Sequence, residues 1–307
     1  MPKLIKKLAL SAVPVIIYFA MFIYFEPYDY FGLKNNEYSG DSAVYRVREF
    51  IKEPSDIIIM GDSKLAHFDM TEVEKLTGEK VGQLSFGGAS LNESMDLLEY
   101  ALEVNPDVHT IYFGVSFYTL NESYYKDRMS QIETIASNPF AYMLSFNYNI
   151  EMLSQIRWWL LGTEDVASVH HKDWKESDYY YEDGTERPYR KNLMEYADLI
   201  YGVCENYVLD TADVERYVEI AKMCQEKGIK LYTVMPPIDR SLRELVVEKL
   251  GIEEHILTFI EQVSPYSEVL NYEYPQEQMF GEEYFYDGFH MDAYSGLPVF
   301  TQMLFDR

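Results

Sequence analysis

The sequence predicts an α/β fold: a parallel sheet covered by helices on both faces, with a helical insertion and one N-terminal transmembrane helix. Three observations carry this prediction. Short apolar runs alternate with helical patterns, and such alternation is typical of a parallel sheet. The alternation is interrupted once, at about 118–210, and a lysine-flanked apolar segment opens the chain. With 307 residues, 48% of them apolar, the chain can form a sizeable core.

The N-terminal segment has the composition of a membrane anchor. Three lysines come first, Lys3, Lys6 and Lys7. The uncharged run of 18 residues at 8–25 follows and approaches the length of about 20 residues that spans a bilayer. A cleavable signal peptide is the alternative, but it needs small residues after its apolar core, whereas this run ends in bulky ones. We therefore expect an anchor and linker at 1–35, a cytoplasmic N-terminus, and an extracytoplasmic domain at 36–307.

The first half of the domain reads as helix and strand in turn. Amphipathic spacing predicts the helices and short apolar runs predict the strands. The helix at 71–77 opens with Thr71 and Glu74, the pattern of a capping box, and a polar cap also precedes the helix at 90–104. The predicted elements are, in order, a helix at 41–52, a strand at 56–60, a helix at 71–77, a strand at 81–84, a helix at 90–104 and a strand at 110–115.

The second half resumes the alternation after the interruption at 118–210. That stretch is too long for a connecting loop, so we expect an inserted helical subdomain with a tyrosine-rich part at 177–190. It follows the third strand, so it is either a lid or substrate platform at the carboxyl edge of the sheet, or a structural addition. The later predicted elements are a helix at 213–227 ended by Gly228, a strand at 230–235, helices at 242–250 and 253–263, a short strand at 268–270 and a closing helix at 292–305.

Charge and cysteine content exclude several classes of function. The net charge of −25 makes a nucleic-acid partner improbable, because phosphate binding needs clustered lysine and arginine. The two cysteines, Cys204 and Cys224, do not have the spacing of a metal site, and we expect neither metal nor organic cofactor. They are either two buried thiols or, in an exported protein, a disulfide.

A serine at the end of the first strand supplies a candidate nucleophile. The run at 56–60 leads into Gly61-Asp62-Ser63, and a buried strand that ends in a glycine turn presents a hydroxyl at the carboxyl edge of a sheet. Near the C-terminus, Asp287 precedes His290 by three residues, so one loop can place the carboxylate beside the imidazole. We expect Ser63 to attack, His290 to accept its proton and Asp287 to orient His290.

The turn after the second strand supplies candidate donors for an oxyanion. An acyl-transfer enzyme needs N–H groups that face the developing negative charge. The segment Phe86-Gly87-Gly88-Ala89 follows the strand at 81–84, and a glycine there lets the chain turn an N–H toward the site. An ordinary strand-to-helix turn would also use glycine.

These residues resemble the motifs of the SGNH/GDSL hydrolases. Gly61-Asp62-Ser63, Gly88 and Asp287-x-x-His290 correspond to the first, second and last blocks of that family. The resemblance covers most of the chain after the anchor. It implies a three-layer, flavodoxin-like fold, a triad of Ser63, Asp287 and His290, and an oxyanion hole that includes the N–H groups of Ser63 and Gly88.

The third family block is altered in this chain. The family has Gly-x-Asn-Asp, whereas the chain has Gly114-Val115-Ser116-Phe117. Ser116 takes the place of the asparagine, so the side-chain donor to the oxyanion would come from Ser116 itself or from Asn121 or Asn92. The loss of one oxyanion donor typically lowers the rate by about 10²–10³-fold.

The anchor, the outward domain and the insertion resemble a narrower group. These are membrane-anchored SGNH-like proteins of bacterial envelopes, the DltD-like (D-alanyl-lipoteichoic acid biosynthesis) group, which work beside a membrane-bound O-acyltransferase. The resemblance implies a serine acyltransferase or esterase that acts on an acylated envelope polymer such as teichoic acid or exopolysaccharide. The alternative is a non-catalytic scaffold or binding partner of the O-acyltransferase.

Overall fold

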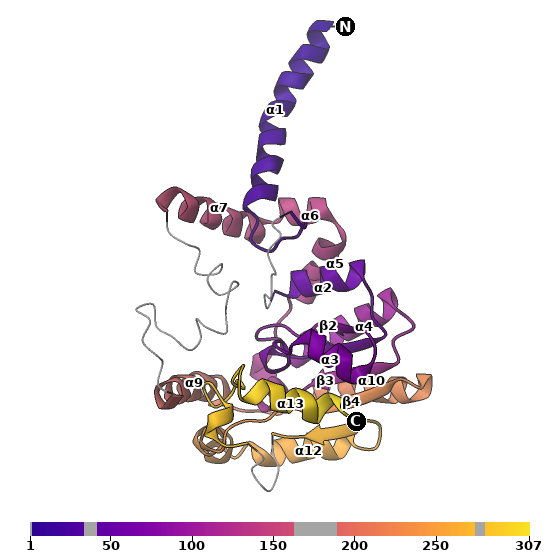
Figure 1. The fold of residues 1–307 in the computed structure, drawn as a ribbon, viewed down its shortest axis with the longest axis vertical. Helices are drawn as coiled ribbons and strands as arrows, with labels where there is room; N and C mark the ends of the chain where they lie inside the picture. Colours follow the sequence, from indigo (N-terminus) through magenta and orange to yellow (C-terminus); the bar gives the residue numbers. More distant parts are fainter. Residues whose placement is uncertain (1, 34–41, 163–188, 274–279) are drawn as a thin grey trace.

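A five-stranded parallel sheet forms the centre of the domain (Figure 1). A computed structural model describes residues 2–33, 42–162, 189–273 and 280–307 of the chain. The strand order is β2-β1-β3-β4-β5, with every neighbouring pair parallel. The strands are β1 (Ile57–Met60), β2 (Val81–Gln83), β3 (Thr110–Gly114), β4 (Lys230–Met235) and β5 (Glu268–Asn271). The predicted α/β class and all five predicted strands are confirmed.

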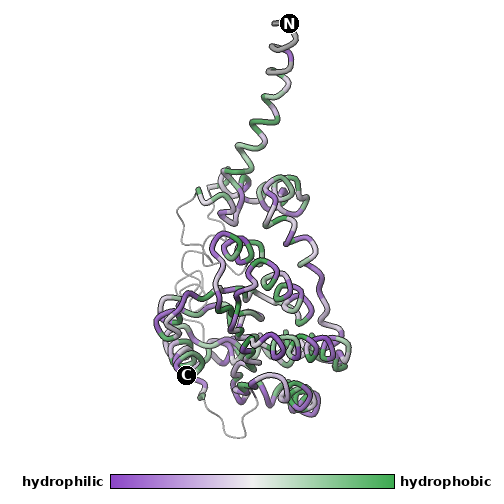
Figure 2. Tube along the Cα trace, turned by 90° about the vertical axis from the view of Figure 1, so that its right-hand side faces the viewer, coloured by the Kyte–Doolittle hydropathy of each residue, from purple (hydrophilic) through white to green (hydrophobic). Residues whose placement is uncertain are grey.

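The sheet separates two hydrophobic cores, because successive side chains of a strand point to opposite faces. Ile57 and Ile59 of β1 belong to one core, and Ile58 and Met60 belong to the other. The first core is covered by α3 (Met70–Thr77) and α13 (Gly296–Phe305). The second is covered by α2 (Ala43–Lys52), α4 (Leu91–Val104), α10 (Thr211–Lys227) and α12 (Glu253–Val263). The strands β1, β3 and β4 are buried along nearly all of their length, as cover on both faces requires. Figure 2 shows hydrophobic and hydrophilic residues mixed along the surrounding helices.

Helix ends depart from the sequence prediction where a different side chain caps the helix. α3 begins at Met70, because Asp69 rather than Thr71 is the cap and accepts the Thr71 N–H at 3.0 Å. The cap predicted for α4 is confirmed, since Ser90 and Glu93 form a capping box. The closing helix begins at Gly296 instead of 292. The Asp292 carboxylate accepts the N–H groups of Tyr294 and Ser295, and this turn holds the residues before Gly296 outside the helix.

The helix predicted at 242–250 is irregular. The structure has α11 (Arg240–Leu242), followed by a π-helical stretch, η4 (Arg243–Glu248). The cap lies earlier than the apolar pattern indicated, since the Asp239 carboxylate accepts the Ser241 N–H at 2.7 Å.

The insertion is helical, as predicted, in the part that the structure describes. It contains two short 3₁₀ turns, η2 (Phe117–Leu120) and η3 (Glu122–Tyr124), and the helices α5 (Met129–Ser137), α6 (Pro139–Leu144), α7 (Phe146–Leu161) and α9 (Tyr189–Cys204). The helices α5 to α7 lie on the side of α1, whereas α9 returns to the sheet (Figure 1). Nearly all of the tyrosine-rich part at 177–190 lies outside the described residues.

The predicted N-terminal helix, α1, spans Pro2–Phe25 and packs on the insertion at its C-terminal end. Phe22 is fully buried, and the Glu26 carboxylate accepts the Tyr142 hydroxyl at 2.8 Å. Among the residues that the structure describes, no helix combines the length and the apolar character needed to cross a membrane. The helical part of the prediction is confirmed, and its membrane-spanning part is not. Residues 34–41 of the predicted linker lie outside the description.

Both cysteines are buried free thiols. Burial raises the pKa of Cys204 to about 12 and that of Cys224 to about 11. Of the two alternatives that the sequence left open, the structure therefore has the reduced pair.

Candidate active site

Ser63 stands at the carboxyl edge of the sheet because β1 ends in a glycine turn. Gly61 has a φ of 136°, and a Cβ there would lie 2.9 Å from the carbonyl oxygen of Gly114 at the end of β3. Only glycine fits that backbone and that approach. The next residue, Asp62, fixes the turn, since its carboxylate accepts the Lys64 N–H at 3.0 Å and the Tyr118 hydroxyl at 2.7 Å.

The C-terminal loop brings His290 and Asp287 to Ser63. The Ser63 Oγ lies 2.9 Å from His290 Nε2, and His290 Nδ1 lies 2.8 Å from Asp287 Oδ2. The other carboxylate oxygen, Oδ1, accepts the N–H groups of Phe289 at 2.9 Å and His290 at 2.7 Å. The predicted proximity of serine, histidine and aspartate is confirmed, across a separation of 227 residues between Ser63 and His290.

The environment of His290 favours the charged form of the ring. Burial lowers its pKa, but the charge of Asp287 and its hydrogen bond outweigh burial, so the pKa is raised above the ordinary 6.5. The side chain of His290 is 23% exposed and that of Asp287 only 4%. The imidazole is therefore reachable from solvent, while the carboxylate behind it is shielded.

The insertion helix α9 packs against the histidine loop. The Tyr196 ring stacks on Phe289, with centroids 5.1 Å apart, and meets the His290 ring edge-on at 5.0 Å. The Asn192 side chain donates to the Tyr286 carbonyl at 3.4 Å. Sequence reasoning placed the insertion at this edge but did not single out Tyr196. The insertion is rich in tyrosine, and its sequence pattern does not indicate which tyrosine faces the site.

Two buried ionisable side chains, Lys64 and Glu273, lie behind the triad, and sequence reasoning missed them. Lys64 follows the nucleophile directly, is 5% exposed, and donates to the Pro236 carbonyl at 3.0 Å. Glu273 is 1% exposed, and its Oε1 accepts the Phe117 N–H at 3.1 Å. Burial raises the pKa of Glu273 to about 7, and burial lowers the pKa of Lys64. Glu273 follows β5, so its place at the shared carboxyl edge was a signal that the sequence offered.

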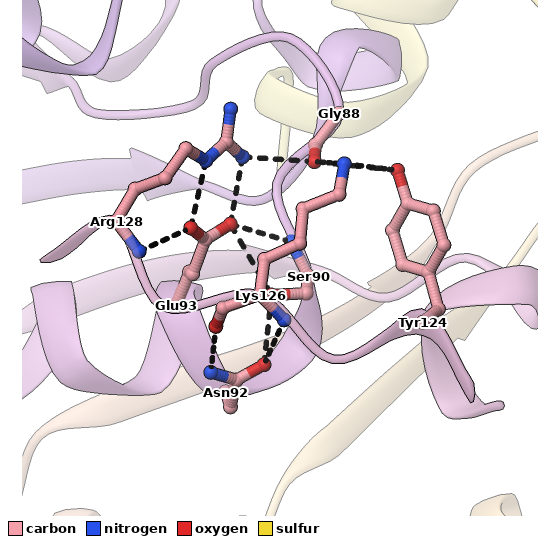
Figure 3. A network of polar contacts seen from close by, with 7 residues as sticks. All are labelled: Gly88, Ser90, Asn92, Glu93, Tyr124, Lys126 and Arg128. Carbon is pink, nitrogen blue, oxygen red and sulfur yellow. Dashed lines mark hydrogen bonds and ion pairs between the residues drawn. The ribbon is translucent and has the colours of Figure 1, made fainter. Parts of the chain in front are cut away.

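Gly88 is held by a network from the insertion (Figure 3). Its φ is 61°, a left-handed conformation that suits glycine. Its carbonyl accepts hydrogen bonds from Lys126 Nζ at 2.7 Å, from an Arg128 Nη at 2.9 Å and from the Tyr124 hydroxyl at 3.3 Å. Glu93 anchors Arg128 by two hydrogen bonds of 2.7 Å. These contacts fix the plane of the peptide that follows Gly88.

Two backbone donors remain available at the site. Within the described residues, neither the Ser63 N–H nor the Gly88 N–H donates a hydrogen bond to the protein. Buried or half-buried N–H groups are nearly always paired, so two such donors at one sheet edge are suited to an oxygen atom of a bound molecule.

The side-chain candidates for the third donor differ in what they contact. Ser116 is 1% exposed, and its hydroxyl has no hydrogen-bond partner among the described residues. The Asn121 amide is fully used, since it donates to Ser123 and to the Val203 carbonyl and accepts the Val208 N–H. Asn92 is held by the backbone of Lys126. Asn121 therefore joins the beginning of the insertion to its end. Of the three side chains, only Ser116 has no hydrogen-bond partner at all among the described residues.

We also searched the described part of the chain for a metal site and for a cavity. This part contains no group of three or more His, Cys, Asp or Glu side chains arranged to hold a metal ion. A cavity of about 740 Å³ lies away from the triad, between α2, α5 and α7, and its lining includes Tyr28, Arg128 and Trp158.

Comparison with protein-family models gives no match, and comparison with curated proteins gives none either. Any function assigned to this chain therefore rests on its own residues and their geometry.

Proposed function

We propose that this protein is a serine acyl-ester enzyme, an acyltransferase or esterase, that acts outside the cell membrane on an acylated envelope polymer such as teichoic acid or exopolysaccharide. One observation carries the proposal: the unbroken relay from Ser63 through His290 to Asp287, with distances of 2.9 and 2.8 Å. These are hydrogen-bonding distances at which an imidazole accepts a hydroxyl proton.

The reaction proceeds in two halves. The Ser63 Oγ attacks the carbonyl carbon of the ester while His290 Nε2 takes its proton, and Asp287 stabilises the imidazolium. The carbon–oxygen bond to the leaving alcohol then breaks, that alcohol takes the proton from His290, and an acyl ester of Ser63 remains. A hydroxyl of the acceptor, or water, repeats these steps and releases the serine. The N–H groups of Ser63 and Gly88 and the hydroxyl of Ser116 hold the oxyanion.

The fold supports a place among the SGNH/GDSL hydrolases. The strand order β2-β1-β3-β4-β5 is the order of flavodoxin-like sheets, and helices cover both faces. We propose this three-layer architecture and this family for the chain. The serine at position 116 in place of the family's asparagine leaves a smaller donor, so we favour transfer to an acceptor over rapid hydrolysis.

The location outside the membrane rests on the sequence. The uncharged run at 8–25 within α1 follows three lysines, and this asymmetry orients the domain away from the cytoplasm. An enzyme fixed there meets polymers of the envelope and a neighbouring membrane-bound O-acyltransferase, which we propose as its partner. The chain needs neither metal nor organic cofactor for the steps above.

The altered third block also supports a second candidate function. Without an asparagine donor, the same site can bind an acyl-bearing polymer and present it to the O-acyltransferase without reacting. In this scaffold role Ser63 forms no covalent intermediate.

A fluorophosphonate probe separates the two functions. We expect the full-length chain in detergent to be labelled, and Ser63→Ala to abolish labelling, because only the activated hydroxyl attacks the phosphorus. Ser137→Ala is the matched control, since its hydroxyl bonds only to carbonyls of its own helix and its loss leaves labelling unchanged. A folded chain that is not labelled would rule out the proposed enzymatic function and leave the scaffold function.

A further inference from the structure

An apolar surface is exposed at the foot of α1, where α6 and α7 meet it. We call these two helices the platform; they lie beside the end of α1, on the side away from the sheet, and α7 runs crosswise to α1 (Figure 1). Side chains of the platform that are between 48% and 77% exposed are Phe140, Leu144, Phe146, Ile150, Leu153, Trp159, Leu160 and Leu161. Soluble proteins rarely expose so many large apolar side chains in one patch, and such a patch marks an interaction surface.

Four of the exposed apolar side chains of α7 form one stripe. Phe146, Ile150, Leu153 and Leu160 follow at intervals of four, three and seven residues, which places them on one face of the helix. Met152 lies on the opposite side and is buried in the core. Arg157 lies within the stripe and is exposed. A long cationic side chain in an apolar stripe can reach a phosphate while its stem stays among acyl chains.

The charge of the platform differs from that of the rest of the molecule. The chain has 51 acidic and 26 basic residues, yet residues 139–161 contain one acid, Glu151, and one base, Arg157. Glu151 is half-buried and lies outside the stripe. The outward face of α7 therefore carries no carboxylate, as contact with anionic headgroups requires.

The platform is continuous with α1. The Phe19 ring lies 6.2 Å from Phe140, and the Phe25 ring lies 5.6 Å from Trp159. The Tyr18 hydroxyl is 2.8 Å from the Asn149 side-chain oxygen. Figure 2 shows α1 hydrophobic along its lower part, where it meets these helices. A bilayer that surrounds α1 at Ile16 and Ile17, which are 63% and 52% exposed, would also meet the platform.

We propose that the platform is a membrane-surface site, with α7 in the plane of the headgroups, its apolar stripe toward the acyl chains and Arg157 toward lipid phosphates. The occupant is the lipid surface. This inference rests on the membrane location proposed above. Because α1 is packed on the platform, the two together set the orientation of the domain toward the bilayer, which a flexible tether would leave free.

The test places a polarity-sensitive fluorophore on the stripe. Leu153→Cys is labelled in the full-length chain, reconstituted in nanodiscs of zwitterionic and anionic lipid. The native thiols stay unlabelled because they are buried and their pKa values are raised. We expect emission at shorter wavelength and loss of fluorescence when the lipids carry brominated acyl chains. Phe146→Cys, on the same stripe, should behave in the same way.

The matched control is Leu199→Cys on α9, far from α1 in Figure 1. Leu153 and Leu199 are 58% and 59% exposed, so their labels start from equal access to solvent. Brominated lipid should leave the label at position 199 unchanged. Equal behaviour of the two labels would contradict the proposed membrane-surface site. A label at position 153 with blue-shifted emission that brominated lipid does not quench would also contradict it, since protein rather than lipid would then cover the stripe.

Three readouts keep the proposals distinct. Fluorophosphonate labelling of Ser63 in the same discs reports on the enzyme. Flotation of the chain with vesicles reports on membrane attachment. Quenching at position 153 reports on the platform. A chain that floats and is labelled but shows no quenching disproves the platform alone, whereas a chain that does not float disproves the proposed membrane location as well.

Discussion

Asp287 makes three hydrogen bonds at once, two to backbone N–H groups and one to the His290 ring. The carboxylate is thus held by its own loop, and the imidazole is held by the carboxylate. In this arrangement the histidine has one tautomer, with the proton on Nδ1 and a lone pair on Nε2 toward Ser63. Each side chain of the relay depends on the one behind it.

Asp287→Asn should lower kcat for a chromogenic acetyl ester by about 10⁴-fold, because the amide favours the wrong tautomer. In the natural chain we expect the rate to fall as pH drops through the pKa of His290, which lies above 6.5, since a protonated ring accepts no proton. Without the aspartate charge this acid limb moves to lower pH. Asp292→Asn, at a carboxylate that serves only a turn, should keep both the rate and the profile.

Ser116→Ala separates an oxyanion donor from a buried hydroxyl that does nothing. If Ser116 holds the oxyanion, kcat falls by about 10²-fold with little change in KM. The free energy of unfolding should not fall, because the hydroxyl has no hydrogen-bond partner within the described part of the chain. Kinetics of ester cleavage and urea unfolding measure the two effects. An unchanged kcat would remove Ser116 from the site.

Glu273→Gln should flatten the pH dependence of stability. The carboxyl pKa is about 7 in the folded protein and 4.5 as its ordinary value. The protonated group contributes stability that is full below pH 4.5 and is lost as pH rises through about 7. The glutamine keeps the acceptor for the Phe117 N–H and does not ionise. Urea unfolding at pH 5 and pH 8 should show a loss of roughly 1–3 kcal/mol in the natural chain that the variant lacks.

At the scale of elements, α4 and the loop at 124–128 act as one clamp. The loop belongs to the insertion, yet it bonds to the first turn of α4 and to the Gly88 carbonyl (Figure 3). The insertion therefore shapes the turn that carries a proposed oxyanion donor, and its α9 packs on the histidine loop. Both flanks of the site depend on chain inserted after β3.

Arg128→Lys should lower kcat by roughly 10-fold to 100-fold and leave KM nearly unchanged, because a lysine cannot bond Glu93 and the Gly88 carbonyl together in one plane. Steady-state kinetics with the acetyl ester measure this split. Arg216→Lys is the matched control, since Arg216 also pairs with α4 but at Asp96 and Glu99, away from the turn. Equal effects of the two variants would mean that the clamp only stabilises α4.

The sequence predicted the strands and the relay better than the buried charges. Ser63 and His290 stand out because a glycine turn and a pinned loop are visible as local patterns. Lys64 and Glu273, which are 209 residues apart along the chain, do not stand out. Their burial depends on how the ends of β4 and β5 and the turn η2 meet at one edge of the sheet. The predicted first residues of two helices were wrong for a related reason. The apolar pattern does not show that the side chains of Asp69 and Asp292 accept backbone N–H groups near the starts of α3 and α13.

At the scale of the molecule, α1 is part of the folded domain. Phe22 is fully buried against Tyr142, with ring centroids 5.3 Å apart and edge-on geometry. Phe22→Ala should therefore lower the free energy of unfolding by about 3–5 kcal/mol, the usual effect of removing a buried ring. Ile17→Ala on the exposed side of the same helix should change it by less than about 0.5 kcal/mol. Thermal unfolding in detergent compares the two, and equal midpoints would mean that the end of α1 is not packed.

The chain order of the triad has a consequence for folding. Ser63 lies near the beginning of the domain, while His290 lies 227 residues later. An unfolded or partly folded chain thus carries a serine with no imidazole beside it and an ordinary, unreactive hydroxyl. In the proposed enzyme, the hydroxyl becomes a nucleophile only when the loop that carries His290 docks beside β1. Reactivity of Ser63 toward a probe would therefore report that the segments on either side of the long insertion have folded together.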